Sequence, residues 1–96
     1  MAKRKRSKSR VQGQEHIVFG AAVRETRARR GMSQEQLGLY SGLHRNYVGA
    51  IERGEINPTF RILRKVATGL NVPLSELIAL FETRLADFWN AIEDVS

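Results

Sequence analysis

Most of the side chains in this sequence that could take part in chemistry are cations, and they are unevenly placed. The chain has 16 lysines and arginines against 10 aspartates and glutamates, a formal net charge of +6. Six of the cations fall within the first ten residues, MAKRKRSKSR. From Asn71 onward the balance reverses, because a single arginine, Arg84, stands against five acidic residues. One end of the domain therefore suits a polyanion and the other end does not.

The residue types that catalysis and metal binding require are not arranged for either task. The chain has no cysteine, and its two histidines, His16 and His44, lie far apart in the sequence. The acidic residues show no spacing typical of metal ligands or of a general acid and base, and no glycine-rich loop of the phosphate-cradling type is present. We therefore expect no catalytic residue, no metal and no cofactor, in a protein that is not an enzyme.

Length and hydropathy indicate one small domain with tails. At 96 residues the chain can bury a single small core. Its apolar runs are far shorter than the roughly 20 residues that span a bilayer, and no apolar segment follows the N-terminal charges. We expect a cytoplasmic, nucleoid-associated protein without a membrane partner.

The sequence predicts a basic arm followed by five helices. Residues 1–14 combine dense like charge with polar residues, so we expect them to be disordered. Helices are expected over residues 17–30, 33–40, 44–53, 60–69 and 74–94. The residues expected to point inward are Ile17, Phe19 and Val23 in the first helix, Val48 and Ile51 in the third, and Leu63, Val66, Ala67 and Leu70 in the fourth.

Local signals mark where the helices start and stop. Ser33 and Gln36 have the spacing of a capping box, in which each side chain satisfies a free backbone amide. Thr59 offers an N-cap hydroxyl to the fourth helix, and Gly31 and Gly54 fit the stop position after a helix. Glycines are also expected inside helices, where each costs about 1 kcal/mol relative to alanine. These are Gly20, Gly38 and Gly49.

The last helix carries an apolar pattern unlike the others. Leu74, Ile78, Phe81, Leu85, Phe88, Ile92 and Val95 follow alternating steps of four and three residues, a heptad seam. We expect the start of this helix, including Leu74 and Leu77, to pack on its own domain. Beyond Phe81 the helix should outrun so small a core, and an exposed apolar face there would be an interaction surface. We therefore expect dimerisation through Phe81, Leu85, Phe88, Trp89 and Ile92.

A set of short motifs resembles the lambda-repressor-like (Cro/repressor, XRE-type) helix-turn-helix family. The matching residues are Gly20, Arg27, Gly31, Ser33 to Glu35, Leu37, Gly42, Leu43, Ile51 to Gly54, Asn57, Pro58 and Leu70 to Pro73. The resemblance covers roughly residues 17–80. It implies an all-α, five-helix fold of the lambda-repressor-like type. Residues 15–73 form the helix-turn-helix domain with helices one to four, and residues 74–96 form the extended C-terminal helix, the expected dimerisation element.

The resemblance also implies which side chains read DNA bases. In this family the third helix lies in the major groove, with its first residues at the base edges. Arg45 can pair bidentately with guanine and Asn46 with adenine, while Ala50 could contact a thymine methyl. His44 stands where a Ser or Thr cap is common, so a base contact, a phosphate contact and a weak cap are all open.

Further roles implied by the resemblance are structural or concern the DNA backbone. Gln34, at the start of the second helix, is similar to the family's phosphate-contacting glutamine. Tyr47, Asn57 and Thr59 also fit positions beside phosphates. Arg27 and Glu52 match a pair that the family joins as a salt bridge across the core.

Together these features predict a transcriptional regulator that binds double-stranded DNA as a homodimer on a palindromic operator, with no small-molecule effector. The segment from Leu43 to Gly54 resembles controller proteins of restriction-modification systems as well as general repressors. Activation and repression both remain open, as does contact of the basic arm with DNA. The alternative function is that of a protein-interaction adaptor or an antitoxin-type partner protein that uses the C-terminal apolar helix.

Overall fold

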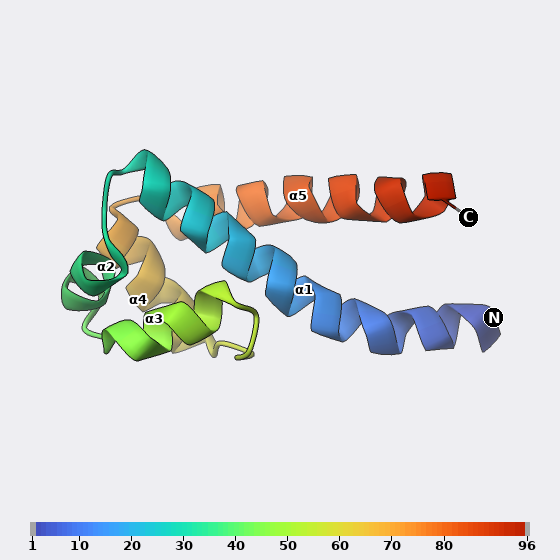
Figure 1. The fold of residues 1–96 in the computed structure, drawn as a ribbon, viewed down its shortest axis with the longest axis horizontal. Coiled ribbons are helices and arrows are strands. Elements are labelled where there is room, and N and C mark those ends of the chain that lie inside the picture. The colour runs from blue at the N-terminus through green and yellow to red at the C-terminus, as the bar shows by residue number, and fades with distance from the viewer. Residues whose placement is uncertain (1, 96) are drawn as a thin grey trace.

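The computed structural model describes the backbone of residues 2–95 and the side chains of residues 14–94. Its elements, shown in Figure 1, are α1 (Ala2–Arg29), α2 (Gln34–Ser41), α3 (Arg45–Glu52), α4 (Phe60–Leu70) and α5 (Leu74–Val95). The predicted all-α fold of five helices is thereby confirmed. No described helix is long and apolar enough to cross a membrane.

The first helix begins much earlier than the hydrophobic pattern predicts. That pattern places its start near Ile17, whereas the backbone is helical from Ala2. A helix closes its hydrogen bonds within its own segment, and alanine, lysine, arginine and glutamine favour it, so α1 can continue outward without core contacts. The expected start is therefore wrong. Met1 and the side chains of residues 2–13 lie outside the described part, so the disorder expected for residues 1–14 stays a prediction and contact of the basic arm with DNA stays open.

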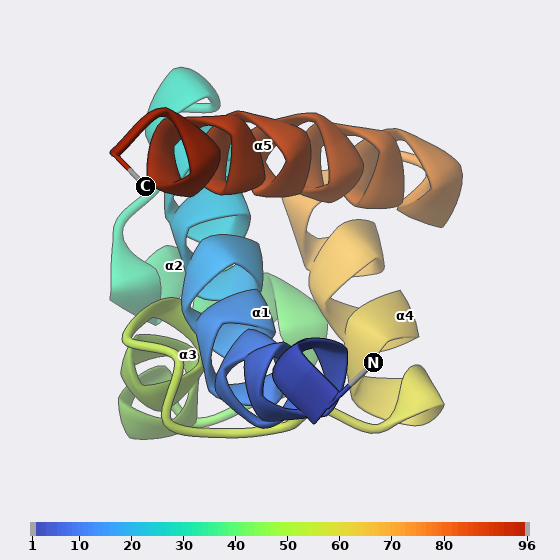
Figure 2. The same cartoon turned by 90° about the vertical axis from the view of Figure 1, so that its right-hand side faces the viewer.

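The core lies between α1, which packs chiefly on α3 and α5, and α2, which packs on α3 and α4. Figure 2 shows α5 passing across one side of α1, while α3 and α4 flank the other side. The core is formed by packing between these helices. The predicted inward residues of α3 are buried, as are most of those of α4. The buried core residues are Phe19, Val23, Leu37, Val48, Ile51, Val66, Ala67, Leu70 and Leu77.

The buried face of α1 is turned from the one that the sequence predicts. Ile17 is 49% exposed, whereas Val18 and Ala22 are buried. The reason is a close backbone contact, because the Cα of Ile17 lies where a side chain on Gly54 would stand. The expectation that Ile17 points into the core is wrong.

Caps hold the short helices at the predicted places. The Ser33 Oγ accepts from the Gln36 backbone N–H at 3.0 Å, and the Gln36 Oε1 accepts from the Ser33 N–H at 2.8 Å. The Thr59 hydroxyl caps α4 by accepting from the Ile62 N–H at 3.2 Å. Gly31 and Gly54 have φ of 69° and 75°, values that glycine adopts without strain. The capping box and both glycine stops are confirmed.

Two of the helical glycines are required by close backbone approach. A methyl group on Gly20 would meet the carbonyl oxygen of Ile51 and would lie 2.6 Å from that of Glu52. A methyl group on Gly38 would lie 2.6 Å from the carbonyl oxygen of Leu43. These glycines let α1 and α2 approach the two ends of α3, which their low helix propensity alone does not reveal.

We predict that Gly20→Ala destabilises the protein, although alanine is the better helix former by about 1 kcal/mol. The added methyl group must push α1 away from α3, and overpacking of this kind typically costs about 1–3 kcal/mol. Urea denaturation followed by circular dichroism measures the change. Ala21→Gly at the neighbouring exposed position is the control, because it should lower the free energy of unfolding only by the difference in helix propensity between alanine and glycine. A Gly20→Ala protein more stable than the wild type would contradict the contact.

The start of α5 belongs to the domain and its end projects from it. Leu77 is buried, and the Phe81 ring packs edge-on against Phe19 with 5.9 Å between ring centroids. The Arg84 Nη2 donates to Glu25 Oε2 of α1 at 2.7 Å, and this hydrogen bond holds the pKa of Glu25 below its usual value. Beyond that pair the helix runs out of the globular part, as Figure 1 shows. Phe81 therefore has a partner within its own chain.

Candidate nucleic-acid interface

The α2–α3 turn is tight because its residues allow the two helices to touch. Gly42 ends α2 in the left-handed conformation at φ 72°, and the Leu43 N–H donates to the Gly38 carbonyl oxygen at 2.8 Å. The backbone nitrogen of Arg45 lies 3.2 Å from the position of a Cβ on Gly38. The turn thus fixes the direction in which α3 starts.

The first side chains of α3 are exposed and set by a histidine cap. The Nδ1 of His44 accepts the backbone N–H of Asn46 at 3.0 Å, so His44 acts as the N-cap. Its Nε2 is then left as the donor of the neutral ring. The exposed side chains of Arg45 and Asn46 have no hydrogen-bond or ion-pair partner among the described residues. They are therefore available to a ligand in front of α3.

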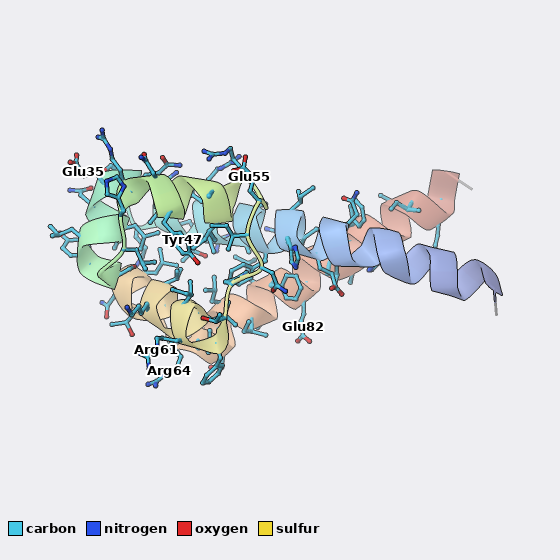
Figure 3. All side chains as sticks on the ribbon, turned by 90° about the horizontal axis from the view of Figure 1, so that it is seen from below. Glu35, Tyr47, Glu55, Arg61, Arg64 and Glu82 are labelled. Carbon is cyan, nitrogen blue, oxygen red and sulfur yellow. The ribbon has the colours of Figure 1, made fainter. Side chains whose placement is uncertain are left out.

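The remaining residues of α3 divide between the core and its edges. Val48 and Ile51 are buried and hold the helix down. Tyr47 is half-buried and points toward the space between α3 and α4, as Figure 3 shows. Ala50 is half-buried. Only one face of α3 is thus left for a partner.

A buried carboxylate ties α1, α2 and α3 together. Glu52, whose side chain is 0% exposed, accepts from Arg27 Nε at 2.6 Å and from Arg27 Nη2 at 3.0 Å. It also accepts from Gln34 Nε2 at 2.9 Å. The hydrogen bonds with Glu52 raise the pKa of Arg27, whose Nη1 donates in addition to the Met32 carbonyl oxygen. The predicted Arg27–Glu52 pair is present, and its surroundings are those of a structural ion pair.

Gln34 is held from inside the protein, a feature that the sequence does not show. Its amide nitrogen is bound to Glu52, and its Oε1 lies 3.6 Å from where a Cβ on Gly49 would stand. Gly49 is buried beneath this amide and the Arg53 guanidinium. Of the groups on Gln34, the second amide hydrogen and the backbone N–H in the first turn of α2 remain for a phosphate.

The α3–α4 loop brings two further predicted residues to the surface. Asn57 is exposed, and its side chain has no hydrogen-bond partner among the described residues. Thr59 is exposed as well, and its oxygen accepts the cap bond of α4, which leaves its O–H free to donate. The loop runs from the end of α3 to the start of α4 along one edge of the domain (Figure 2).

A family model described as helix-turn-helix matches residues 23–77, which hold α2, α3, α4 and the adjoining turns of α1 and α5. The chain belongs to this family. The resemblance to XRE-type, lambda-repressor-like proteins is thereby confirmed.

The helix-turn-helix chain is similar to several named proteins over part of its length. Control protein C.SmaI of Serratia marcescens is 45% identical over 61 residues, which are 64% of this chain and 73% of that protein. The HTH-type transcriptional regulator SutR of Escherichia coli is 42% identical over 64% of this chain, but this match spans only about a third (34%) of SutR. An adaptor or antitoxin-type partner protein, the alternative considered from the sequence, finds no support among these relatives.

Solved structures of restriction-modification controller proteins have the same fold. C.AhdI from Aeromonas hydrophila is 42% identical, with a TM-score of 0.65 over 67% of this chain and 97% of that one. Wild-type C.Esp1396I is 26% identical, with a TM-score of 0.72 over 76% of this chain and 95% of that one. The arrangement of α2, α3 and α4 is therefore that of known helix-turn-helix proteins.

Arg53, just after α3, has an ion-pair partner that the sequence does not predict. Arg53 Nε donates to Glu55 Oε2 at 2.8 Å, and the pair lowers the pKa of Glu55 and raises that of Arg53. The signal in the sequence is the opposite charge two residues on. This exposed pair neutralises the C-terminal end of α3, so the positive charge of the helix is concentrated at Arg45.

Groups that could hold a metal ion are absent from the described side chains. No cluster of three or more histidine, cysteine, aspartate or glutamate residues lies there.

Proposed function

We propose that this chain is a DNA-binding transcriptional regulator that reads a specific sequence through α3. The observation that carries the proposal is the pair Arg45 and Asn46, whose side chains are exposed and have no partner among the described residues, at the capped start of a helix whose opposite face is buried. Such a helix can enter the major groove without disturbing the core. Support comes from the relatives, since SutR and SlrR are named HTH-type transcriptional regulators and C.SmaI and C.BamHI control proteins.

The side chains at the front of α3 divide the task of reading bases. The guanidinium of Arg45 can donate two hydrogen bonds to O6 and N7 of guanine, and the amide of Asn46 can bond N6 and N7 of adenine. His44 caps the helix through Nδ1 and can offer its Nε2–H to a phosphate or a base. The methyl group of Ala50 can contact a thymine methyl. Sequence preference then rests mainly on Arg45 and Asn46.

Contacts to the DNA backbone would lie on either side of Arg45 and Asn46. The second amide hydrogen of Gln34 lies at the start of α2, where the helix dipole favours an anion. The Thr59 O–H, the Asn57 amide and the Tyr47 hydroxyl are further donors for phosphates. Contacts of this kind position the protein, and they make its affinity fall with rising salt.

Selection of bound sequences from a random duplex pool tests the proposal. We expect recovery of a conserved half-site that contains guanine and adenine at adjacent positions, repeated with inverted symmetry. Sequencing after several rounds, followed by gel-shift titration of the recovered site against a scrambled duplex, measures the preference. A pool that stays random while the protein still binds would mean that the charge of the chain, and not α3, accounts for its affinity.

We also propose that α5 joins two copies, so that two recognition helices lie about 34 Å apart, one turn of DNA. The projecting part of α5 keeps Leu85, Phe88 and Trp89 only half-buried, and the rings of Phe88 and Trp89 meet edge-on with 5.3 Å between centroids. Ile92 lies further along the same seam and is 41% exposed. Phe81 contributes at most its outer edge, because its ring also packs on Phe19.

We predict that Leu85→Asp with Phe88→Asp converts the protein to a monomer, because two carboxylates cannot enter an apolar seam without a partner. Sedimentation velocity measures the change. Thr83→Asp with Asn90→Asp adds the same charge at exposed positions off the seam and should leave the dimer intact. Without dimerisation, the protein should also no longer bind an operator with two half-sites more tightly than a single half-site. If the first variant still sediments as a dimer, the interface lies elsewhere.

The regulator proposed here uses no catalytic step, no cofactor and no small-molecule effector, and it works on the nucleoid in the cytoplasm. Binding to purified operator DNA with no added metabolite or metal tests the claim that no cofactor or effector is needed. Imaging of a fluorescent fusion of the full chain against a DNA stain tests the second, since a diffuse signal outside the nucleoid would contradict it.

A further inference from the structure

The cations of α4 differ from most others in the domain because they lack partners. Arg24 and Arg27 contact Glu52, and Arg29 and Arg84 contact Glu25. Arg53 contacts Glu55, and Arg30 donates to two backbone carbonyls. The described cations without an ion pair or a side-chain hydrogen bond are Arg45 of the proposed DNA face and three residues of one helix. Those three are Arg61, Arg64 and Lys65.

These three cations of α4 line one groove. A groove of about 470 Å³ lies between α2 and α4, and Tyr40, Phe60 and Thr68 line it together with them. We call it the α2–α4 groove. Its volume is within the range of ligand sites, about 300–1,000 Å³. No acidic residue lines it, and α4 itself contains none. The groove is thus a concave surface with positive charge of its own.

Two large aromatic side chains that line the groove face solvent. Phe60 is 69% exposed and Tyr40 is 56% exposed. Exposed apolar side chains that lie together are typical of an interaction surface. The surface therefore combines apolar contact area with unpaired cations.

The α2–α4 groove does not belong to the proposed DNA-reading face. In Figure 3, Arg61 and Arg64 project from α4 at one edge of the domain, while Glu35 and Glu55, at the start of α2 and just after α3, project at the opposite edge. The same view shows Arg61 and Arg64 projecting from α4 away from α3, so a duplex held by the front of α3 leaves these two side chains uncovered. A second partner could therefore bind while the protein is on DNA.

We propose that the α2–α4 groove binds an acidic amphipathic helix of another protein. The carboxylates of such a helix pair with Arg61, Arg64 and Lys65, and its apolar residues cover Tyr40 and Phe60, as when an amphipathic helix lies in a groove. A phosphate backbone matches the cations but offers no apolar surface to Tyr40 and Phe60. A second copy of this chain carries an acidic helix in α5, but α5 projects from the other end of the domain, so its docking here would build an open head-to-tail chain.

A synthetic peptide tests this proposal on the full-length protein. The probe is a fluorescein-labelled amphipathic helix with glutamates on one face and leucine and phenylalanine on the other. The control peptide carries lysines in place of the glutamates. Fluorescence anisotropy should show saturable binding of the acidic peptide only. Binding should weaken at least about tenfold near 1 M salt, where the Debye length falls to about 3 Å.

Charge-matched variants place the binding in the groove. Arg61→Ala with Arg64→Ala removes two positive charges, and Thr83→Glu with Asn90→Glu adds two negative charges on exposed positions of α5, so the two proteins have the same net charge. We expect the first pair to weaken peptide binding at least about tenfold, which is 1.4 kcal/mol, and the second pair to change it little. Circular dichroism and operator binding should be unchanged in both.

Several results would overturn the proposal. Equal effects of the two variant pairs would mean that net charge alone attracts the peptide. Tighter competition by single-stranded DNA than by the acidic peptide would make the groove a nucleic-acid site. Concentration-dependent growth of the wild-type chain into large assemblies, abolished by Arg61→Ala with Arg64→Ala, would make its occupant a second copy. None of these results bears on DNA reading by α3, which the pool selection tests separately.

Discussion

Replacement of Arg45 and Asn46 together by alanine is expected to remove operator recognition while leaving the fold intact. Each bidentate contact to a base is worth about 1–3 kcal/mol of discrimination, and a dimer would make each contact twice. Both side chains are exposed and without partners in the described part of the chain, so their removal leaves no buried group unsatisfied. Gel-shift titration of the selected operator against a scrambled duplex should show the two affinities converging.

A matched control separates lost base reading from lost charge. Arg64→Ala removes the same charge from the face opposite α3 and should bind the operator almost as tightly as the wild type. Arg45→Lys keeps the charge but loses the planar fork of the guanidinium, so it should retain non-specific affinity and lose discrimination at the guanine. If the Arg45 and Asn46 double variant still prefers the operator, other residues read the bases.

The sequence predicts best those features that local chemistry determines. Ser33 and Gln36 can form their reciprocal cap with only four residues in place, and Gly31 and Gly54 end helices because few other residues adopt a positive φ. The apolar spacing of Val48 and Ile51 indicates which face of α3 is buried, and hence which face is free. The position of Arg45 at the start of α3 follows from these local features.

The features that the sequence does not predict depend on contacts between distant segments. Val18 and Ala22 are buried in place of Ile17 because the backbone of α1 lies against Gly54, far along the chain. Gly20 resembles a weak point until the carbonyl of Ile51 is seen beside it. The α2–α4 groove requires both helices, and no local pattern distinguishes its arginines from ordinary surface cations. Tertiary approach, and not propensity, decides each of these cases.

Substitution of Glu52 is expected to have the largest effect on stability. Glu52→Ala removes the acceptor of Arg27 and Gln34 and leaves the Arg27 guanidinium, which is 16% exposed, without its carboxylate. The loss of one partner of a buried pair typically costs about 3–5 kcal/mol, a large share of the roughly 5–15 kcal/mol that holds a domain together. Urea denaturation followed by circular dichroism should show a lower midpoint with an unchanged slope.

The double variant Arg27→Met with Glu52→Met separates two roles of Glu52. One is to stabilise the fold with Arg27, and the other is to position Gln34 for a phosphate of the DNA. Two well-packed apolar side chains can replace a buried ion pair at little or no cost in stability, so the double variant should be clearly more stable than Glu52→Ala. Its Gln34 amide would nevertheless have lost the carboxylate that holds it over Gly49. A stable double variant with weakened operator binding would therefore show that Glu52 positions Gln34 for the phosphate. Full operator affinity in the same variant would limit Glu52 to the fold, because Gln34 would then need no internal partner.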